Sequence, residues 1–325
     1  MNLCKSLFVC AAVALTIGAQ PAVAQIYPTK PVRIITPFPP GSGPDAALRL
    51  VGDKLTRAWG QQVIIENRPG GNGFIALQAA KQAAPDGYTL VQADSYHLAA
   101  HPYLYKKIPY DPVKDFEPVS PLFRNYFFVT VPANSTWKNM TDLINAAKIK
   151  TDNLNYGSWF IGSPGHLGAA ALEGATSTHM SHIPFKDMSQ LYQAVGANDV
   201  NWAFGSAASA GALYRAGKVK FLAVAAPKRV AGYADVPTVS ESGGPPNFEV
   251  SAWIGILAPR GTPREIVAKL NKDIAAALAL PDVVERFASF AYEPYPMTPA
   301  DMAKLIDAES RKYGEIVKHA SISLD

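Results

Sequence analysis

Residues 32–49 read VRIITPFPPGSGPDAALR, and this stretch decides how the chain folds. It predicts a buried strand, a loop of proline and glycine, and the start of a helix. Pro44 suits the first helical position, because the N–H that proline lacks would have no partner there. Free amides and the positive dipole end at a helix start favour an anion, so the stretch is a candidate half of a carboxylate site. An ordinary strand-to-helix turn explains the pattern equally well.

The same order of strand, small-residue loop and helix returns in residues 154–167, which read LNYGSWFIGSPGHL. Ser163 is a favoured helix cap, and Pro164 again takes the first helical position. A shorter loop of this kind begins at Gly205 and Ser206. The first two loops are more than 100 residues apart and suggest two halves of one clamp.

The wider pattern predicts an α/β fold with two domains. Strands and helices alternate from residue 126 to residue 225, which is typical of a mostly parallel sheet with helices on its faces. Apolar runs at 126–131 and 250–257 predict strands that cross between the domains. The proline-rich residues 103–121 and 227–248 predict irregular connections.

Two helices are expected near the end of the chain. Thr262 precedes a proline and stands three residues before Glu265, which predicts a capping box and a helix to about Leu280. Thr298 also precedes a proline and predicts a helix that ends near Ala320.

The chain begins with features of a secretory signal peptide. A basic start precedes an apolar run at 7–19, and Ala22-Val23-Ala24 forms a cleavage site, so we expect cleavage after Ala24 and a periplasmic protein. Both cysteines, Cys4 and Cys10, lie in the removed segment. This excludes a disulfide framework, a cysteine nucleophile and a thiolate metal site in the mature chain.

Composition argues against two further classes of protein. The formal charge of +4 is a mild excess without a cluster of basic and aromatic residues, so we expect no nucleic-acid partner. After the signal peptide, no apolar run reaches the ~18 residues of a membrane-spanning helix.

Catalytic and metal motifs are weak. No G-x-S-x-G elbow occurs, and the spacing of Ser163 and His166 is that of a cap and its neighbour. The histidines include the pair His179 and His182, which straddles a strand entry, so we expect no metal site. Gly71-x-Gly73-x-x-Ala76 matches a loose dinucleotide fingerprint, for which a tight turn is the simpler interpretation. Ser95 and His97 follow a strand, where a ligand crevice often lies, although a satisfied loop histidine is an equal alternative.

An ordered set of short blocks runs through the chain. They read YPTKPVR at 27–33, FPPGSGPD at 38–45, ENRPGGNG at 66–73, APDGYTL at 84–90, NYGS at 155–158, SPGHL at 163–167 and VPT at 236–238. In these blocks the chain resembles the periplasmic solute receptors of the tripartite tricarboxylate transporter family, also called Bug or TctC-like proteins. The resemblance covers essentially the whole mature chain.

The resemblance implies a Venus-flytrap fold. Each of two lobes would be a mixed, mostly parallel sheet flanked by helices, with residues 25–124 plus 251–325 in one lobe, 125–250 in the other, and two crossing segments. It also implies that the loops Phe38–Asp45 and Gly157–Ser163 grip a ligand carboxylate as the lobes close. The protein would then be a monomeric receptor, not an enzyme, without a cofactor, that serves the membrane components of a transporter.

This chain departs from the family pattern where the far end of a ligand would lie. It has Phe185-Lys186-Asp187-Met188 where relatives often carry Tyr-Lys-Gly-Gly, Gly205-Ser206 where they often carry an aspartate, and the large Trp159-Phe160. Added aromatic side chains and a lost acidic group favour an aromatic dicarboxylate such as terephthalate. An aliphatic dicarboxylate such as adipate is the nearest competitor.

The ligand-binding residues expected on this basis lie on or next to the three loops, after the strand that precedes Ser95, and at Phe185. They are Phe38, Pro39, Gly41, Ser42, Gly43, Asp45, Ser95, His97, Ser158, Trp159, Phe160, Ile161, Gly162, Ser163, His166, Phe185 and Ser206. The competing classes are an enzyme that uses a nucleotide cofactor at Gly71–Ala76 and a protein that only binds other proteins. Titration with carboxylates beside NAD separates the three.

Overall fold

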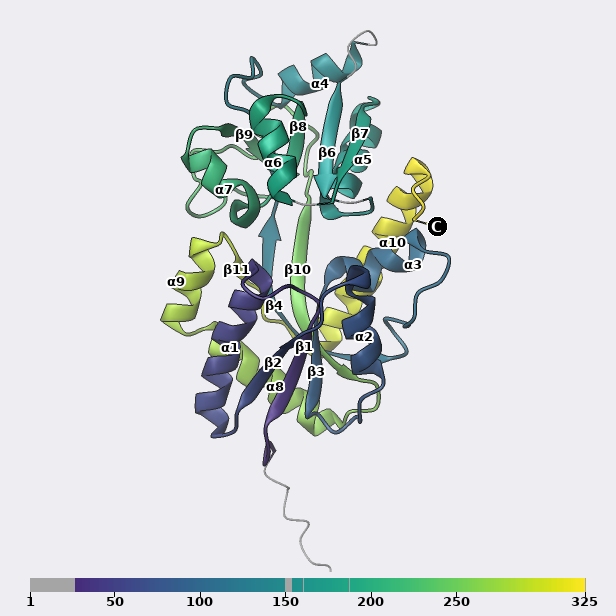
Figure 1. The fold of residues 1–325 in the computed structure, drawn as a ribbon, viewed down its shortest axis with the longest axis vertical. Coiled ribbons are helices and arrows are strands. Elements are labelled where there is room, and N and C mark those ends of the chain that lie inside the picture. Colours follow the sequence, from purple (N-terminus) through teal and green to yellow (C-terminus); the bar gives the residue numbers. More distant parts are fainter. Residues whose placement is uncertain (1–26, 150–153, 160, 187, 325) are drawn as a thin grey trace, which may run out of the picture.

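The computed structural model describes residues 27–149, 154–159, 161–186 and 188–324 (Figure 1). The expected signal peptide and Phe160 lie outside these residues. Two β-sheets, each flanked by helices, form two lobes stacked along the long axis of the molecule. The two-lobed α/β fold is thereby confirmed.

The first lobe contains a six-stranded sheet in the order β11-β4-β10-β3-β1-β2. Its strands are β1 (Val32–Thr36), β2 (Val63–Asn67), β3 (Thr89–Asp94), β4 (Phe116–Tyr126), β10 (Ser251–Pro259) and β11 (Glu293–Pro294). Its helices are α1 (Gly43–Trp59), η1 (Gly71–Gly73), α2 (Phe74–Lys81), η2 (Tyr96–Ala100), α3 (His101–Leu104), α8 (Arg264–Leu278), α9 (Pro281–Ser289) and α10 (Pro299–Ala320).

The second lobe contains a five-stranded sheet in the order β7-β6-β8-β5-β9. Its strands are β5 (Phe128–Pro132), β6 (Asn155–Trp159), β7 (Ser181–Phe185), β8 (Trp202–Gly205) and β9 (Val219–Val224). Its helices are α4 (Met140–Lys148), α5 (Pro164–Thr176), α6 (Met188–Ala197) and α7 (Ala207–Arg215). The chain enters this lobe between β4 and β5, at Phe127, and leaves it before β10.

Strand directions bring the functional loops of both lobes to the boundary between them. β3 is antiparallel to β10, which runs away from the boundary, so β3 and its parallel partner β1 run toward it. In the second lobe β8 is antiparallel to β5, so β8 and the parallel β6 and β7 also run toward the boundary. The carboxyl ends of strands from both sheets therefore face each other.

Both sheets are mixed, as expected, and most strands of each sheet run in the same direction. β10 is antiparallel to both β3 and β4, and β5 is antiparallel to both β8 and β9. A strand that enters a lobe from the boundary must run opposite to strands whose carboxyl ends face that boundary. Each sheet is therefore mixed, with parallel pairs confined to the strands that carry the loops.

The prediction of an irregular connection at residues 103–121 is wrong for its last part, because β4 begins at Phe116. Pro118 and Pro121 lie inside this strand, opposite Leu257 and Gly255 of β10. The pairing of β4 with β10 shifts in register near these two prolines. On its other side, β4 pairs with β11 only at Phe123 and Arg124, so prolines, which lack an N–H, are tolerated in the strand.

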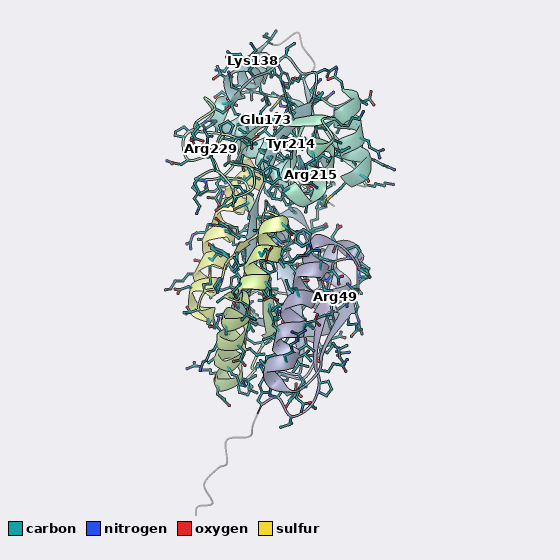
Figure 2. All side chains as sticks on the ribbon, turned by 90° about the vertical axis from the view of Figure 1, so that its left-hand side faces the viewer. Arg49, Lys138, Glu173, Tyr214, Arg215 and Arg229 are labelled. Atoms are coloured by element: carbon teal, nitrogen blue, oxygen red, sulfur yellow. The ribbon has the colours of Figure 1, made fainter. Side chains whose placement is uncertain are left out.

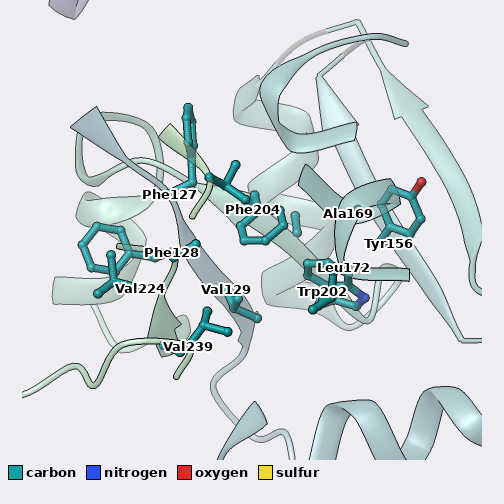
Figure 3. Close-up of a cluster of buried hydrophobic side chains, with 14 of the residues drawn as sticks. Phe127, Phe128, Val129, Tyr156, Ala169, Leu172, Trp202, Phe204, Val224 and Val239 are labelled. Atoms are coloured by element: carbon teal, nitrogen blue, oxygen red, sulfur yellow. The ribbon is translucent and has the colours of Figure 1, made fainter. Parts of the chain in front are cut away.

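The second lobe has a core of large aromatic side chains (Figure 3). Val129 of β5 is paired with Phe204 of β8 there, and Trp202 and Phe204 are fully buried. The Phe128 ring points away from them and stacks on Phe221, with ring centroids 4.5 Å apart. The same cluster continues across the boundary to Tyr96 and Tyr313, whose ring centroids lie 4.9 Å apart. The lobes therefore share apolar packing on the side where α10 lies.

The helix α10 contacts both lobes. It begins as expected at Thr298, whose hydroxyl accepts a hydrogen bond from the Asp301 N–H (3.1 Å), and packs on β4 and α8 before it reaches α5. After the helix, the Leu324 N–H donates to the Leu104 carbonyl (2.9 Å). Together with the two crossing segments, α10 forms a third link between the lobes (Figure 1).

Candidate functional site

The loop between β1 and α1 is held in shape by the buried carboxylate of Asp45, whose side chain is 2% exposed. Its Oδ2 accepts hydrogen bonds from the Gly41 N–H (2.8 Å) and from Arg49 Nε (3.0 Å). Its Oδ1 accepts one from Asn67 Nδ2 (2.7 Å). Burial alone would raise the pKa of this carboxyl, but hydrogen bonds from Arg49, Asn67 and Gly41 outweigh it and hold the pKa below its ordinary value.

This arrangement gives Asp45 an internal role. Because its oxygens already have three donors within the protein, the carboxylate positions the loop from beneath. Asn67 also donates to the Phe38 carbonyl (2.9 Å), and Arg49 Nη2 donates to Asn67 Oδ1 (2.8 Å). Arg49 lies on the side of the first lobe that Figure 2 faces. Asn67 and Arg49 were not identified from the sequence. A signal existed for Asn67, because it is a polar residue at the carboxyl end of a strand, as Ser95 is.

The amide donors of this loop divide into two groups. Those of Gly41 and Ser42 are used inside the loop, because the Ser42 N–H and hydroxyl both donate to the Pro39 carbonyl (3.2 and 2.7 Å). The N–H groups of Gly43 and Asp45 belong to the first turn of α1, where no carbonyl of the helix can accept them. The anion-binding potential of this lobe is therefore concentrated at the first turn of α1.

Ser95 and His97 follow β3 at the same edge of the sheet. The Ser95 hydroxyl is fully buried and has no hydrogen-bond partner in the described part of the chain. His97 Nδ1 lies 2.6 Å from Asp94 Oδ1, so this histidine is satisfied within its own loop. Burial would raise the pKa of Asp94, but the charge and hydrogen bonds of His97 lower it overall.

The glycine fingerprint at residues 71–76 packs against this histidine. A Cβ on Gly73 would lie 2.1 Å from His97 Nε2, and Gly73 has a φ of +86°, which side chains rarely adopt. Gly73 is therefore required by close packing and by a tight turn. This supports the simpler of the two interpretations of the motif.

The loop between β6 and α5 is the counterpart in the second lobe. The Ser163 hydroxyl accepts a hydrogen bond from the His166 N–H (3.3 Å), which confirms the predicted cap. Gly162, with a φ of +78°, donates its N–H to His166 Nδ1 (2.9 Å). The loop is thus closed on the helix start by His166, as the first loop is closed by Asp45.

A stacked pair of histidines lies beneath this second loop. The rings of His166 and His182 are 3.8 Å apart and nearly parallel, and His182 Nε2 lies 2.8 Å from the Ser158 hydroxyl. Burial and the neighbouring His182 lower the pKa of His166 to about 3, and burial lowers that of His182 to about 4. Both imidazoles are therefore neutral at ordinary pH, and Ser158 is held by an uncharged partner.

The remaining candidates in the second lobe lie at the same edge. Trp159 is 6% exposed and packs on Phe127 of the crossing segment, with ring centroids 5.5 Å apart. Phe185 is half-buried against the core. Ser206 caps α7, because its hydroxyl accepts the Ser209 N–H (3.2 Å) and its own N–H donates to the Ser209 hydroxyl (3.0 Å).

The second loop reaches the first lobe at the boundary between the lobes. A Cβ on Gly162 would lie 2.7 Å from Leu104 Cδ1 in α3, so the second loop touches the first lobe there. Ile161, beside it, is 37% exposed. The described candidates of the first lobe (Phe38, Pro39, Gly41, Ser42, Gly43, Asp45, Ser95 and His97) thus lie at one face of the boundary, and those of the second lobe (Ser158, Trp159, Ile161, Gly162, Ser163, His166, Phe185 and Ser206) at the other.

A metal-binding cluster and a membrane-spanning helix are both absent from the described residues. Within residues 27–149, 154–159, 161–186 and 188–324, no three histidine, cysteine, aspartate or glutamate side chains gather into a group that could hold a metal ion. None of the helices described there is long and apolar enough to cross a membrane.

Comparison with known proteins agrees with the geometry. The model of the tripartite tricarboxylate transporter family receptor (TctC) matches residues 47–322. The chain is 30% identical to protein BugT of Bordetella pertussis, with 100% of each chain covered. It superimposes on R. palustris Rpa4515 with adipate at a TM-score of 0.81 (30% identity, covering 92% of this chain and 100% of that one). For MatC from Rhodopseudomonas palustris with bound malate the TM-score is 0.76 (31% identity, 90% and 100%).

Proposed function

The chain belongs to the receptor family of tripartite tricarboxylate transporters, a family of periplasmic solute-binding proteins, and from this premise we propose that it binds a dicarboxylate between its lobes. It would deliver the ligand to the membrane components of such a transporter. Cleavage of the signal peptide after Ala24 and a monomeric state belong to the same proposal. So do the lobe boundaries, at residues 124/125 and 250/251.

The observation that supports the proposal is that two helix starts, one from each lobe, lie at the same boundary. α1 and α5 each begin with a proline in the first turn, each follows a loop closed by its own side chain, and each faces the other lobe. Hydrogen bonds to a charged carboxylate contribute roughly 1.5–3 kcal/mol each. Two or three of them, with burial of the ligand body, reach the roughly −8 kcal/mol of micromolar binding.

For the ligand we propose an aromatic dicarboxylate such as terephthalate, with an aliphatic one such as adipate as the alternative. Trp159 and Phe127 supply an aromatic pair next to the second loop, and Ser206 stands where an acidic residue would repel a second carboxylate. The alternative is favoured by the two similar structures, which contain adipate and malate.

Calorimetric titration of the purified mature protein tests the proposal. The panel contains terephthalate, benzoate, adipate and malate, with NAD as the ligand of the competing enzyme hypothesis. We expect micromolar or tighter binding of at least one dicarboxylate and no heat with NAD. Saturable binding of NAD, or an absence of binding for every carboxylate, would refute the proposal.

Closure is tested separately by small-angle scattering. Because each lobe supplies one loop, full contact with a ligand requires both loops to approach it. We expect a smaller radius of gyration with the dicarboxylate that binds most tightly. A radius that stays unchanged at saturating ligand would contradict the clamp.

A further inference from the structure

A tyrosine far from the predicted loops reaches the start of α1. A Cβ on Gly43 would lie 2.3 Å from the hydroxyl oxygen of Tyr292, so in the structure this hydroxyl lies against the backbone of Gly43. Figure 1 shows β11, which follows Tyr292 directly, beside that end of α1. The residue at position 43 must be glycine for the hydroxyl to take this place.

The ring of Tyr292 is held firmly while its hydroxyl is left without a protein partner. The ring stacks on Phe123, with centroids 4.0 Å apart and an angle of 8° between the planes. The Tyr292 N–H donates to the Phe287 carbonyl (2.9 Å), and Tyr292 as a whole is 6% exposed. None of the described residues forms a hydrogen bond with the hydroxyl. The ring is thus fixed by the protein, whereas the hydroxyl is free to pair with a group from outside the chain.

We propose that the Tyr292 hydroxyl donates a hydrogen bond to the carboxylate held at the first turn of α1. The inference rests on the proposed function and adds a third donor to the amides of Gly43 and Asp45. Since Tyr292 comes from the segment after α9, this half of the site would be built from both ends of the chain.

The chemistry of the hydroxyl fits an anionic ligand. Burial raises the pKa of Tyr292, so the hydroxyl stays protonated throughout the neutral range and can donate. Its ring is fixed by Phe123 and by the turn at Ala291, which has a φ of +52°. A donor whose orientation is fixed before binding loses little freedom when the ligand arrives.

Tyr292→Phe tests the proposal, because it removes one oxygen and retains the stack on Phe123. We expect binding of the tightest dicarboxylate of the panel to weaken about 10- to 100-fold, the range for a hydrogen bond to a charged group. Tyr27→Phe is the matched control. Tyr27 is a buried tyrosine of the same lobe whose hydroxyl donates to the Gly87 carbonyl (2.6 Å), at the opposite end of β3 from the boundary. This variant should bind like the wild type.

Gly43→Ala provides a second measurement. The added methyl group must displace the Tyr292 hydroxyl, so the variant should bind more weakly, and the further loss caused by Tyr292→Phe in that background should be smaller than in the wild type. Unfolding midpoints of all variants confirm that the folded protein is compared.

The outcomes separate the two proposals. Wild-type protein that binds no carboxylate overturns both. Wild-type protein that binds a dicarboxylate, together with a folded Tyr292→Phe variant of equal affinity, overturns only the role of Tyr292. An equal loss in Tyr27→Phe would likewise show that the effect comes from a general change in the lobe.

Discussion

Replacing Asp45 with asparagine should weaken both the fold and the binding of every carboxylate. The carboxylate accepts three hydrogen bonds, two at Oδ2 and one at Oδ1, whereas an asparagine side chain has only one oxygen. At least one of the donors from Gly41 or Asn67 would then face an amide NH₂. The change keeps the shape of the side chain and removes its charge.

The magnitude follows from the exposure of the partners. A lost hydrogen bond to a buried charge costs roughly 1.5–3 kcal/mol. The Arg49 side chain is 47% exposed, so screening limits its ion pair to about 1 kcal/mol or less. Together we expect Asp45→Asn to lower the free energy of unfolding by about 2–3 kcal/mol.

The dependence on pH gives this prediction a distinct signature. Because the folded pKa of Asp45 lies below its ordinary value of 3.8, the carboxylate stabilises the fold above that value. Its contribution is lost as the pH falls through the folded pKa. Urea unfolding should therefore show the full difference between wild type and variant at pH 7, and a smaller difference below about pH 4.

Binding should fall by a similar factor for terephthalate, adipate and benzoate, because the loop held by Asp45 serves the carboxylate that they share. Asp53→Asn is the matched control, since Asp53 is an exposed residue of the same helix. A variant as stable as the wild type at pH 7, or a loss of affinity confined to one ligand, would refute the reasoning.

Three further predictions concern the second lobe. Trp159→Ala should cost about 3–5 kcal/mol of stability, because the ring is buried on Phe127. In calorimetric titration the same variant should lose more affinity for terephthalate than for adipate. Equal losses of affinity would mean that the ring only supports the fold. Gly205→Asp cannot test the missing acidic group, because its Cβ would lie 2.9 Å from both Ala210 Cβ and Thr130 Oγ1. Ser206→Asp keeps a good cap and adds the charge, so it should weaken dicarboxylates more than benzoate, and a uniform loss would contradict this. The pKa values of His166 and His182 are low in the folded protein, so below about pH 6.5 the unfolded chain binds protons that the native protein does not. The free energy of unfolding should therefore fall as the pH is lowered from about 6.5, by up to about 1.4 kcal/mol per pH unit for each of the two histidines. Urea titrations between pH 7 and pH 5 should show a shallower fall for His166→Gln, and an unchanged slope would contradict the assignment.

Local sequence signals predicted the helix starts well where the cap is made by neighbouring residues. Ser163 and Thr298 accept the N–H three residues later, and this short-range bond is visible in the sequence. Thr262 was predicted to do the same and does not. Its hydroxyl donates back to the Pro259 carbonyl (2.8 Å), and Pro263 becomes the cap residue of α8.

Long-range contacts set the limit of sequence reasoning. Pro118 and Pro121 favour a loop locally, but both lie in β4, where they pair with residues of β10. Local propensity cannot predict this pairing, because the paired residues are more than 130 positions apart in the sequence. The loop that begins at Phe38 was correctly identified, whereas the inward direction of Asp45 depends on Asn67 from the next strand. Tyr292 lies about 250 residues from Gly43, and nothing near it in the sequence indicates the contact.

The way in which the chain passes between the sheets has a consequence for the order of folding. The second lobe is one uninterrupted segment, and its two ends are joined by a hydrogen bond from the Phe127 N–H to the Val250 carbonyl (3.1 Å). The first lobe, by contrast, has β10 in the interior of its sheet, between β3 and β4. During synthesis from the N-terminus, the nested segment can therefore collapse around its own aromatic core while its host still lacks an interior strand. Assembly would proceed from the insert outward, and the boundary between the lobes would be the last surface to form.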